Sequence, residues 1–244
     1  MISAKDYIAI DFLPGMRGLF STRRGGESPT PFDSLNLSFG VGDAAELVVQ
    51  NRCRVKKTLG ISRLLSARQV HGDHILSIVE QPQTDEEYDG YDSLITNQLG
   101  VGIMVQQADC QAVVLYDPLK RVVANVHVGW RGSVAKILNK TMQRLCTDFG
   151  TDPRTVLAAI SPSLGPCCAQ FTNFQTELPP EFHPFQIQPA YFDFWAITQH
   201  QLEASGVLPA HIRNARMCTR CNPNFFSFRR EGVTGRSATV VVLQ

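Results

Sequence analysis

The chain has 244 residues, of which 43% are hydrophobic and 9% aromatic, and it carries a formal net charge of +1 at pH 7. A chain of this length and composition can bury a substantial core. Its near-neutral charge gives no electrostatic reason to expect a nucleic acid or an anionic membrane as the main partner. No low-complexity tract, charge block or evident linker interrupts the sequence, so we expect one domain over residues 1–244.

The N-terminal stretch has acidic residues and a proline inside any candidate apolar region, and no later run approaches the length of a membrane span. The seven cysteines are odd in number and two of them are adjacent, which favours reduced thiols over a disulfide framework. We expect a cytoplasmic protein with no membrane partner, acting as a monomer or a small homo-oligomer.

The first predicted element is a short strand from Gly18 to Thr22, which leads into Arg23-Arg24-Gly25-Gly26. Glycines permit positive φ and let a ligand approach the backbone closely. Arginines beside such a loop, Arg23 among them, could hold a phosphate. The alternative is a solvated turn with two surface charges.

A helix is predicted from Asp43 to Leu59, where apolar residues recur at helical intervals among good helix formers. Asp43 is the expected N-cap and Gly60 the expected stop. Asn51 and Arg52 lie in the middle of this helix, and we interpret them as ordinary exposed polar residues.

Two strands, Arg68–His71 and Ile75–Val79, are predicted to pair as a hairpin around Gly72-Asp73. His71 then lies at the turn, where a histidine is either a polar turn residue or a ligand. His74, three residues further on, is its local competitor.

The stretch from Gln81 to Asp92 is acidic and rich in turn formers, so we expect a loop or a lid. Asp89-Gly90 and Asp92 could contact a substrate there. A solvated acidic loop is the alternative.

Two valine-rich runs, Ala112–Asp117 and Arg121–His127, are separated by a tetrad with proline in its second position, which pre-sets a turn. The runs should pair antiparallel. Cys110 precedes the first run and His127 ends the second, so both should lie at the open end of the hairpin and could meet.

From Ser133 to Phe149 apolar residues recur at helical intervals, and Gly150 ends the pattern. Gly129-Trp130-Arg131-Gly132 precedes this helix. A helix start with free amides, two glycines and Arg131 suits an anion such as phosphate. The alternative is a surface ion pair for Arg131 and a core position for Trp130.

The C-terminal half continues to alternate strands and helices. Strands are predicted at Thr155–Ile160, Phe225–Phe228 and Ala238–Leu243, and an amphipathic helix at Tyr191–Gly206. The whole pattern predicts an α+β fold, a mixed α/β sandwich with a mixed sheet and flanking helices. The sequence contains neither the glycine-rich motif of dinucleotide-binding proteins nor a Walker motif, so it does not support a bound dinucleotide or a Walker-type ATP site.

Cys218-Thr219-Arg220-Cys221 is a CxxC pair, and Cys167 and Cys168 are adjacent. Together they could form an all-cysteine structural metal centre with four thiolates. The alternative is that the thiols pack as small hydrophobes. Only the fold decides whether the two elements meet.

Motifs spread along nearly the whole chain resemble the laccase-domain, or polyphenol-oxidase-like, family, which includes bacterial purine nucleoside phosphorylases and peptidoglycan-editing factors. The matching segments are Ser21–Gly26, Ser34-Leu35-Asn36-Leu37, Gly42-Asp43, Asn51-Arg52, Gln69-Val70-His71-Gly72, Ala108-Asp109-Cys110, His127–Gly132 and Phe226–Arg230. In one segment the chain departs from the family: Cys168 is followed by Ala169-Gln170, where a Tyr-Glu pair is common. A carboxylate near the pocket is therefore expected to be missing.

The resemblance implies that His71 is a zinc ligand together with Cys110 and His127, and that Asn36 lies near the pocket. One thiolate and two imidazoles leave the fourth tetrahedral position open, as in catalytic rather than structural zinc sites. Asp109, beside the metal, either moves a proton or orients a ligand imidazole.

The function that the resemblance implies is zinc-dependent phosphorolysis of adenosine, inosine or methylthioadenosine to base and ribose 1-phosphate, with adenosine deamination as a companion activity. Arg131 with the helix start, and Arg23, would hold the phosphate. One alternative is a copper oxidase of phenols, which needs a histidine-rich copper cluster, whereas the chain has six histidines. The other is a peptidoglycan-precursor editing factor with no nucleoside turnover.

Overall fold

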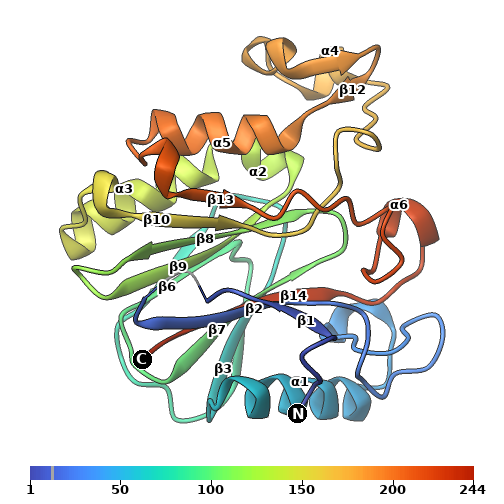
Figure 1. The fold of residues 1–244 in the computed structure, drawn as a ribbon, viewed down its shortest axis with the longest axis vertical. Helices are drawn as coiled ribbons and strands as arrows, with labels where there is room; N and C mark the ends of the chain where they lie inside the picture. Colours follow the sequence, from blue (N-terminus) through green and yellow to red (C-terminus); the bar gives the residue numbers. More distant parts are fainter. Residues whose placement is uncertain (12–13) are drawn as a thin grey trace.

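The computed structural model describes residues 1–11 and 14–244, and in it two six-stranded β-sheets pack face to face with helices on their outer faces (Figure 1). This arrangement confirms the predicted mixed α/β sandwich. No helix in the described ranges combines the length and apolarity needed to cross a membrane.

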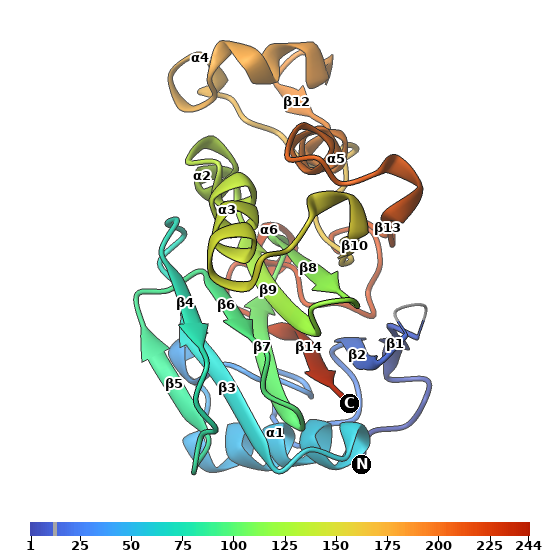
Figure 2. The same cartoon turned by 90° about the vertical axis from the view of Figure 1, so that its left-hand side faces the viewer.

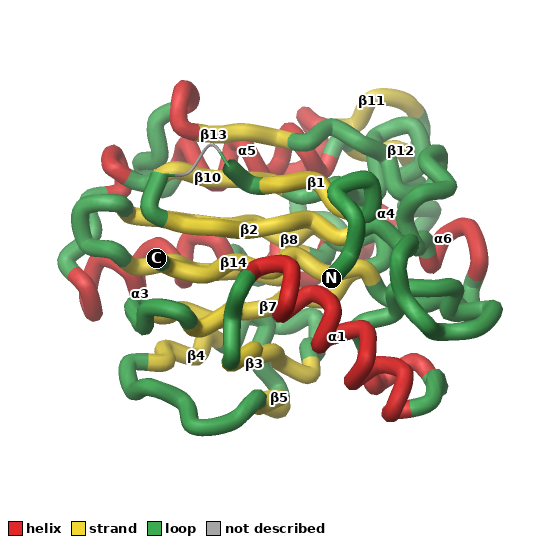
Figure 3. The backbone as a smooth tube through the Cα atoms, turned by 60° about the horizontal axis from the view of Figure 1, so that its bottom comes forward, coloured by secondary structure: helices red, strands yellow, loops and turns green. Residues whose placement is uncertain are grey.

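The first sheet contains the first and last strands of the chain and is mostly antiparallel. In order across the sheet its strands are β1 (Tyr7–Ala9), β2 (Met16–Ser21), β14 (Ser237–Leu243), β7 (Val101–Gln107), β3 (Arg63–Arg68) and β5 (Glu86–Asp89). The pairs β7–β3 and β3–β5 are parallel, and the others are antiparallel. Figure 3 shows β2, β14 and β7 side by side beneath α1.

The second sheet is built around the predicted hairpin. In order its strands are β13 (Ile212–Asn214), β10 (Leu157–Ile160), β8 (Gln111–Asp117), β9 (Val122–Val128), β6 (Ser93–Thr96) and β4 (Ile75–Ile78). β8 and β9 pair antiparallel with Ala112 opposite His127, which confirms the hairpin. A separate ribbon joins β11 (Gln186–Gln188) to β12 (Tyr191–Phe192).

Helices cover the two outer faces. α1 (Ala45–Leu59) lies on the first sheet, and α2 (Trp130–Val134), α3 (Ile137–Phe149) and α5 (Phe194–Ala204) lie on the second (Figures 1 and 2). α4 (Phe174–Glu177) lies beyond α5 with the β11–β12 ribbon, and α6 (Phe228–Glu231) precedes β14.

Three apolar layers hold this sandwich together. Val55 and Leu59 of α1 pack with Val240 of β14, Leu65 and Val114 meet between the sheets, and residues of α3 pack on β9. Each buried aliphatic side chain contributes about 1.5–3 kcal/mol to folding. The pocket described below is therefore built on a rigid double sheet.

The predicted hairpin around Gly72-Asp73 is wrong, because β3 and β4 lie in different sheets. The segment between them crosses from one sheet to the other, with His71 at φ 60°. Asp92 fixes this crossing by accepting hydrogen bonds from the backbone N–H groups of residues 70, 71 and 72.

Three other details differ from prediction. The stretch 81–92 is not all loop, because β5 pairs parallel with β3. Phe225–Phe228 is not a strand: Phe226 is buried in a loop, and Ser227 caps α6. Asp43 does not cap α1, since its carboxylate accepts hydrogen bonds from Ser28 and Asn36.

The predicted helix from Ser133 to Phe149 is two helices. α2 ends at Val134, Lys136 adopts φ 59°, and α3 begins at Ile137. The Trp130–Gly132 segment therefore forms the first turn of a short helix of its own, and the long helix starts further on.

Candidate functional site

Three metal-binding side chains meet at the open end of the β8–β9 hairpin. Cys110 directly precedes β8, His127 belongs to β9, and His71 comes from the crossing between the sheets. Their donor atoms all lie within 4.8 Å of one another. Two of these residues are neighbours because the hairpin brings them together, and the third is added by the crossing that the sequence did not reveal.

His127 is held in a fixed orientation by Asp92. The Nδ1 atom of His127 lies 2.8 Å from Oδ1 of Asp92, whose side chain has 0% exposure. Burial raises the pKa of Asp92, but His127 and the backbone N–H groups outweigh it and lower the pKa below its ordinary value. The ionised carboxylate accepts a hydrogen bond from Nδ1–H, so Nε2 is the ring nitrogen that a metal ion would bind after its proton is lost.

Cys110 and His127 favour each other's charged forms. Burial raises the pKa of Cys110, but the charge and hydrogen bonds of His127 and His71 lower it to about 6. Burial lowers the pKa of His127, but Cys110 and Asp92 raise it to about 9. Without a metal ion the pair is therefore a thiolate beside an imidazolium, and a metal ion bound by both side chains would take the place of the Nε2 proton of His127.

Gly129 gives these donors room. A Cβ atom at this position would lie 3.2 Å from Cys110 Sγ, 3.2 Å from His71 Cδ2 and 3.7 Å from His127 Cε1. A side chain here would press on Cys110 and His71 and would touch His127. The donor set of one thiolate and two imidazoles, with this open space beside it, fits a divalent metal such as zinc.

The donors open into a cavity of about 850 Å³, a volume typical of small-molecule sites. Aromatic, amide, cationic and acidic side chains line it, the acidic ones being Glu87, Asp109 and Glu177. Aromatic rings come from Trp130, Phe171, Phe194 and Phe228, amides from Gln69, Gln106, Gln107 and Gln111, and cations from Arg68, Arg229 and Arg236. The cavity can thus hold a ligand with a flat apolar part and an anionic part.

Asp109 lines the cavity beside Cys110, with φ 85°. Its carboxylate accepts hydrogen bonds from Thr219 Oγ1 at 2.7 Å and from the backbone N–H of Arg229 at 2.6 Å. Neither partner is a histidine. The imidazole that we expected Asp109 to orient is held by Asp92 instead.

The three other predicted site residues lie outside the cavity lining. Arg131 is exposed and stacks over the Trp130 ring at 4.8 Å. Arg23 forms ion pairs with Asp33 and Glu231 and lines a smaller cavity of about 290 Å³.

Asn36 is fully buried, and its Oδ1 accepts the backbone N–H of Arg236 at 2.9 Å. It therefore positions a cavity arginine rather than reaching the cavity itself.

Sequence reasoning gave Asp92 a possible substrate contact but did not foresee its contact with His127, and it missed Arg236 as a site residue. Asp92 lies in a stretch that looked solvated, and its burial depends on the pairing of β6 with β9. Arg236 lies one residue before the apolar strand β14, and a single arginine there carries no motif. Arg52, interpreted as exposed, forms a largely buried ion pair with Glu87 at 2.7 Å, and Glu87 lines the cavity.

Comparison with known proteins identifies the family. The model of the multi-copper polyphenol oxidoreductase laccase family matches residues 17–244. The purine nucleoside phosphorylase YlmD of Geobacillus stearothermophilus is 33% identical, over 92% of this chain and 89% of that protein. The crystal structure of this YlmD superposes with a TM-score of 0.89 at 30% identity, covering 100% of this chain and 98% of the other.

An adenosine deaminase, RL5, from an unknown prokaryotic organism is 31% identical over 94% of this chain and 96% of that protein. These matches extend over nearly the full length of the chain, in sequence and in fold. The chain therefore belongs to the multi-copper polyphenol oxidoreductase laccase family.

Proposed function

We propose that this protein is a zinc-dependent purine nucleoside phosphorylase that converts adenosine, inosine or methylthioadenosine to the free base and the corresponding ribose 1-phosphate. The observation that carries the proposal is the three-donor group of His71, Cys110 and His127, which opens into a cavity lined by aromatic and arginine side chains. Relatives at about 30% identity that are named purine nucleoside phosphorylases support the reaction class.

His71, Cys110 and His127 would hold the zinc ion, with Nε2 of His127 as one ligand atom because its Nδ1 faces Asp92. When bound, zinc acts as a Lewis acid and lowers the pKa of a water molecule toward neutrality. Asp92 keeps the imidazole in the tautomer that can bind metal.

Arg236 and Arg229 are the cations best placed to hold phosphate. Arg236 is half-buried and lines the cavity together with Cys110 and Asp109; burial lowers its pKa, and the charges of those two residues oppose this only in part. Its Nη1 donates to the carbonyls of Thr234 and Gly235 and fixes the side chain. This assignment replaces Arg131 and Arg23, which are not among the residues that line the cavity.

In phosphorolysis, a phosphate oxygen bonds to the anomeric carbon while the glycosidic C–N bond breaks and the purine leaves with the bonding electrons. The arginines would aim the phosphate and neutralise its charge. Phe171 and Phe194, whose ring centroids lie 5.0 Å apart, offer faces for the purine. Oε1 of Gln111 is buried at the cavity without a donor among the described residues, so it can accept a substrate N–H or O–H.

Adenosine deamination is a second candidate activity, favoured by the relative named adenosine deaminase. It would use the same donor group, with Asp109, the cavity-lining residue before Cys110, as the carboxylate that holds a proton. Deamination needs water and no phosphate, so the two activities separate in a phosphate-free assay.

Copper is the alternative metal, and phenol oxidation the alternative reaction. In the described part of the chain only one group of three or more potential metal ligands contains histidine, and it has two. Multicopper oxidation needs a larger histidine cluster, so the residues present favour zinc.

The cytoplasmic location, the single domain and the oligomeric state expected from the sequence stay predictions.

The test is to measure the metal content of the purified protein and to follow inosine and adenosine by chromatography with and without phosphate. We expect zinc together with phosphate-dependent release of the base and ribose 1-phosphate, and Cys110→Ala should lose this release and the zinc ion of the three-donor group. A zinc-loaded protein that leaves every nucleoside unchanged would overturn the proposal and favour a peptidoglycan-precursor editing role without turnover.

A further inference from the structure

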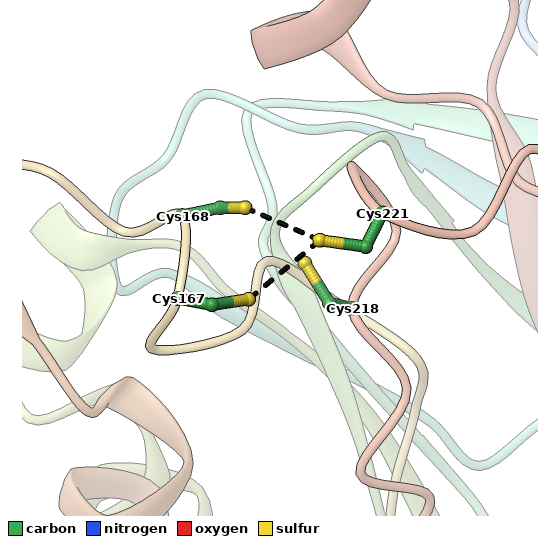
Figure 4. Close-up of side chains that lie close together, drawn as sticks. All are labelled: Cys167, Cys168, Cys218 and Cys221. Carbon is green, nitrogen blue, oxygen red and sulfur yellow. Dashed lines mark hydrogen bonds between the residues drawn. The ribbon is translucent and has the colours of Figure 1, made fainter.

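A second group of potential metal ligands lies apart from the three-donor group. Cys167 and Cys168 come from the segment after β10, and Cys218 and Cys221 come from the loop after β13. Figure 4 shows their side chains pointing at one another from the two loops. All four sulfur atoms lie within 4.8 Å of one another, and Sγ of Cys221 lies 3.5 Å from that of Cys168 and 3.7 Å from that of Cys167.

Hydrophobic packing does not account for this cluster. Cys168 is buried, but Cys167 and Cys221 are exposed and Cys218 is only partly buried. Thiols that pack as small apolar groups gain stability by leaving water, and three of these four have not left it. An interaction other than hydrophobic packing must therefore stabilise the cluster of the four cysteines.

The backbone brings the thiols together. The two loops run side by side through hydrogen bonds from Ser163 N to Met217 O at 3.1 Å and from Thr219 N to Ser163 O at 3.0 Å. A tight turn places Cys168 N 2.9 Å from Gly165 O, and a second turn places Asn222 N 3.0 Å from Cys218 O.

Gly165 allows the contact between the loops, since a Cβ there would lie 3.0 Å from Cys218 Cβ. The four sulfurs are therefore preorganised by the chain itself.

We propose that Cys167, Cys168, Cys218 and Cys221 bind a zinc ion as a closed, structural four-thiolate site. A tetrahedral ion with Zn–S bonds of about 2.3 Å places its sulfurs about 3.8 Å apart. Two distances in the cluster, 3.5 and 3.7 Å, are close to this spacing. A polynuclear iron–sulfur cluster would hold the thiolates further apart, because several irons and sulfides lie between them.

Binding releases the proton of each thiol to solvent and involves no oxidation or reduction. Four thiolates around a divalent ion leave two negative charges uncompensated. Arg220 lies within the CxxC segment, and its Nη1 is 3.5 Å from Sγ of Cys168, so it supplies a countercharge. Zinc is the common ion for such a soft donor set.

The site would fasten the cavity wall to the rest of the fold. Ala169, Gln170 and Phe171, directly after Cys168, line the cavity. Thr219, between the CxxC cysteines, donates to Asp109 at 2.7 Å. A metal ion that joins the two loops therefore holds both a wall of the cavity and the partner of Asp109.

The first test counts zinc in the purified protein after reconstitution of the metal-free chain. We expect two zinc ions per wild-type chain, one in Cys110→Ala, one in Cys221→Ser and none in the double variant. Cys53→Ser, which changes an exposed cysteine on α1, is the matched control and should retain both ions. Because Cys110→Ala removes only the first site, failure of the proposed enzyme activity would leave this result unaffected.

The second test replaces zinc by cobalt(II) in the Cys110→Ala background, where only the four-cysteine cluster remains. We expect visible d–d bands and intense thiolate-to-cobalt charge transfer, both lost with Cys221→Ser. Zinc should also protect four cysteines from alkylation until a chelator is added.

A wild-type chain that binds one zinc ion, lost in Cys110→Ala and kept in Cys221→Ser, would overturn the proposal. So would mass spectrometry that finds disulfides among these cysteines in the freshly purified protein, or iron in place of zinc at equal supply. Cys168→Ser provides a second variant if Cys221→Ser fails to fold, and it should lose the same ion.

Discussion

The three-donor group and the four-cysteine group are both clusters of soft ligands, but they differ in the number of donors and in their surroundings. The first has three donors, a buried carboxylate behind one imidazole, and a large cavity in front. The second has four donors on two surface loops and no cavity of its own among those described. An open coordination position suits chemistry, and a closed set suits structure.

The two groups are linked by one hydrogen bond. Asp109 neighbours Cys110 of the first group, and it accepts from Thr219, which lies between two cysteines of the second. The comparison therefore predicts that damage to the first group stops the reaction, whereas damage to the second mainly weakens the fold. The following experiments test this division, from the largest expected effect to the smallest.

Cys110→Ala should have the largest effect. It removes the thiolate ligand, and loss of a catalytic metal removes several kcal/mol of transition-state stabilisation, or about a thousandfold in kcat/KM. Steady-state kinetics with inosine and phosphate measure the loss. The thermal midpoint should change far less than the rate, and equal losses in Cys53→Ser would refute the assignment.

Arg236→Gln should raise the KM for phosphate by about 10–150-fold, because a charge-assisted hydrogen bond to phosphate contributes about 1.5–3 kcal/mol. Arg131→Gln is the matched variant and should change this KM less than about threefold. A larger increase in the KM for phosphate in Arg131→Gln than in Arg236→Gln would instead indicate that phosphate binds at the start of α2, as the sequence predicted.

Asp92→Asn should lower zinc affinity or activity by about 10–100-fold. The amide can donate to Nδ1 of His127 and so move the ring proton to Nε2, where it blocks metal binding. Competition with a chromogenic chelator measures the affinity. Asp89→Asn, an exposed neighbour on β5, is the control, and a similar loss there would show that the effect is not specific to the His127 contact.

Cys168→Ser should lower the free energy of unfolding by about 2–4 kcal/mol, the range typical of a covalent cross-link between distant segments. For a chain of this size each kcal/mol shifts the thermal midpoint by about 2–4 °C. Scanning calorimetry with and without chelator measures the shift, which should be absent in Cys53→Ser. Phosphorolysis at low temperature should persist, and its complete loss would contradict the division between the two groups.

Glu87→Gln should lower the free energy of unfolding by about 2 kcal/mol at neutral pH, because it leaves Arg52 without its partner. This effect is smaller than that of Cys168→Ser. Burial raises the pKa of Glu87, but Arg52 lowers it below the ordinary value of 4.5. The unfolded chain therefore binds more protons, so the wild-type contribution is present above this value and disappears as the pH falls through the folded pKa.

Denaturant unfolding of wild type and Glu87→Gln, at neutral pH and again in acid, measures the difference in the free energy of unfolding between the two proteins. It should shrink in acid. Glu86→Gln, on the exposed neighbour, should show no such pH dependence, and a constant difference for Glu87→Gln would count against the ion pair.

Much of the fold was readable because local patterns matched the final environment. The β8–β9 hairpin, α1 and β14 each have a clear period and their own turn or stop signal. The crossing at His71 was misread because Gly72-Asp73 favours a hairpin, and the buried carboxylate that overrides this preference comes from residue 92. Charged residues that pair across elements, such as Arg52 and Glu87, also look exposed in the sequence.

Only part of the candidate site could likewise be predicted from the sequence. Cys110 and His127 could be placed together because one hairpin carries both, whereas His71 depended on the family resemblance. Arg131 looked like an anion ligand from its neighbours, but the break at Lys136 turns that segment into a separate short helix. Arg236 reaches the cavity through a contact with Asn36 that is 200 residues away in the sequence, and no local pattern encodes it.

The far end of the β8–β9 hairpin has a practical consequence. Its seven-residue strands span about 23 Å, so the Pro118–Arg121 turn lies well away from the donors at the open end. Leu119 is 74% exposed, and the turn is held by Asp117 Oδ1 and by Arg121, which donates to the C-terminal Gln244 carbonyl. A fluorophore attachment site or short peptide tag grafted between Leu119 and Lys120 should leave both donor groups in place, giving a handle for surface immobilisation.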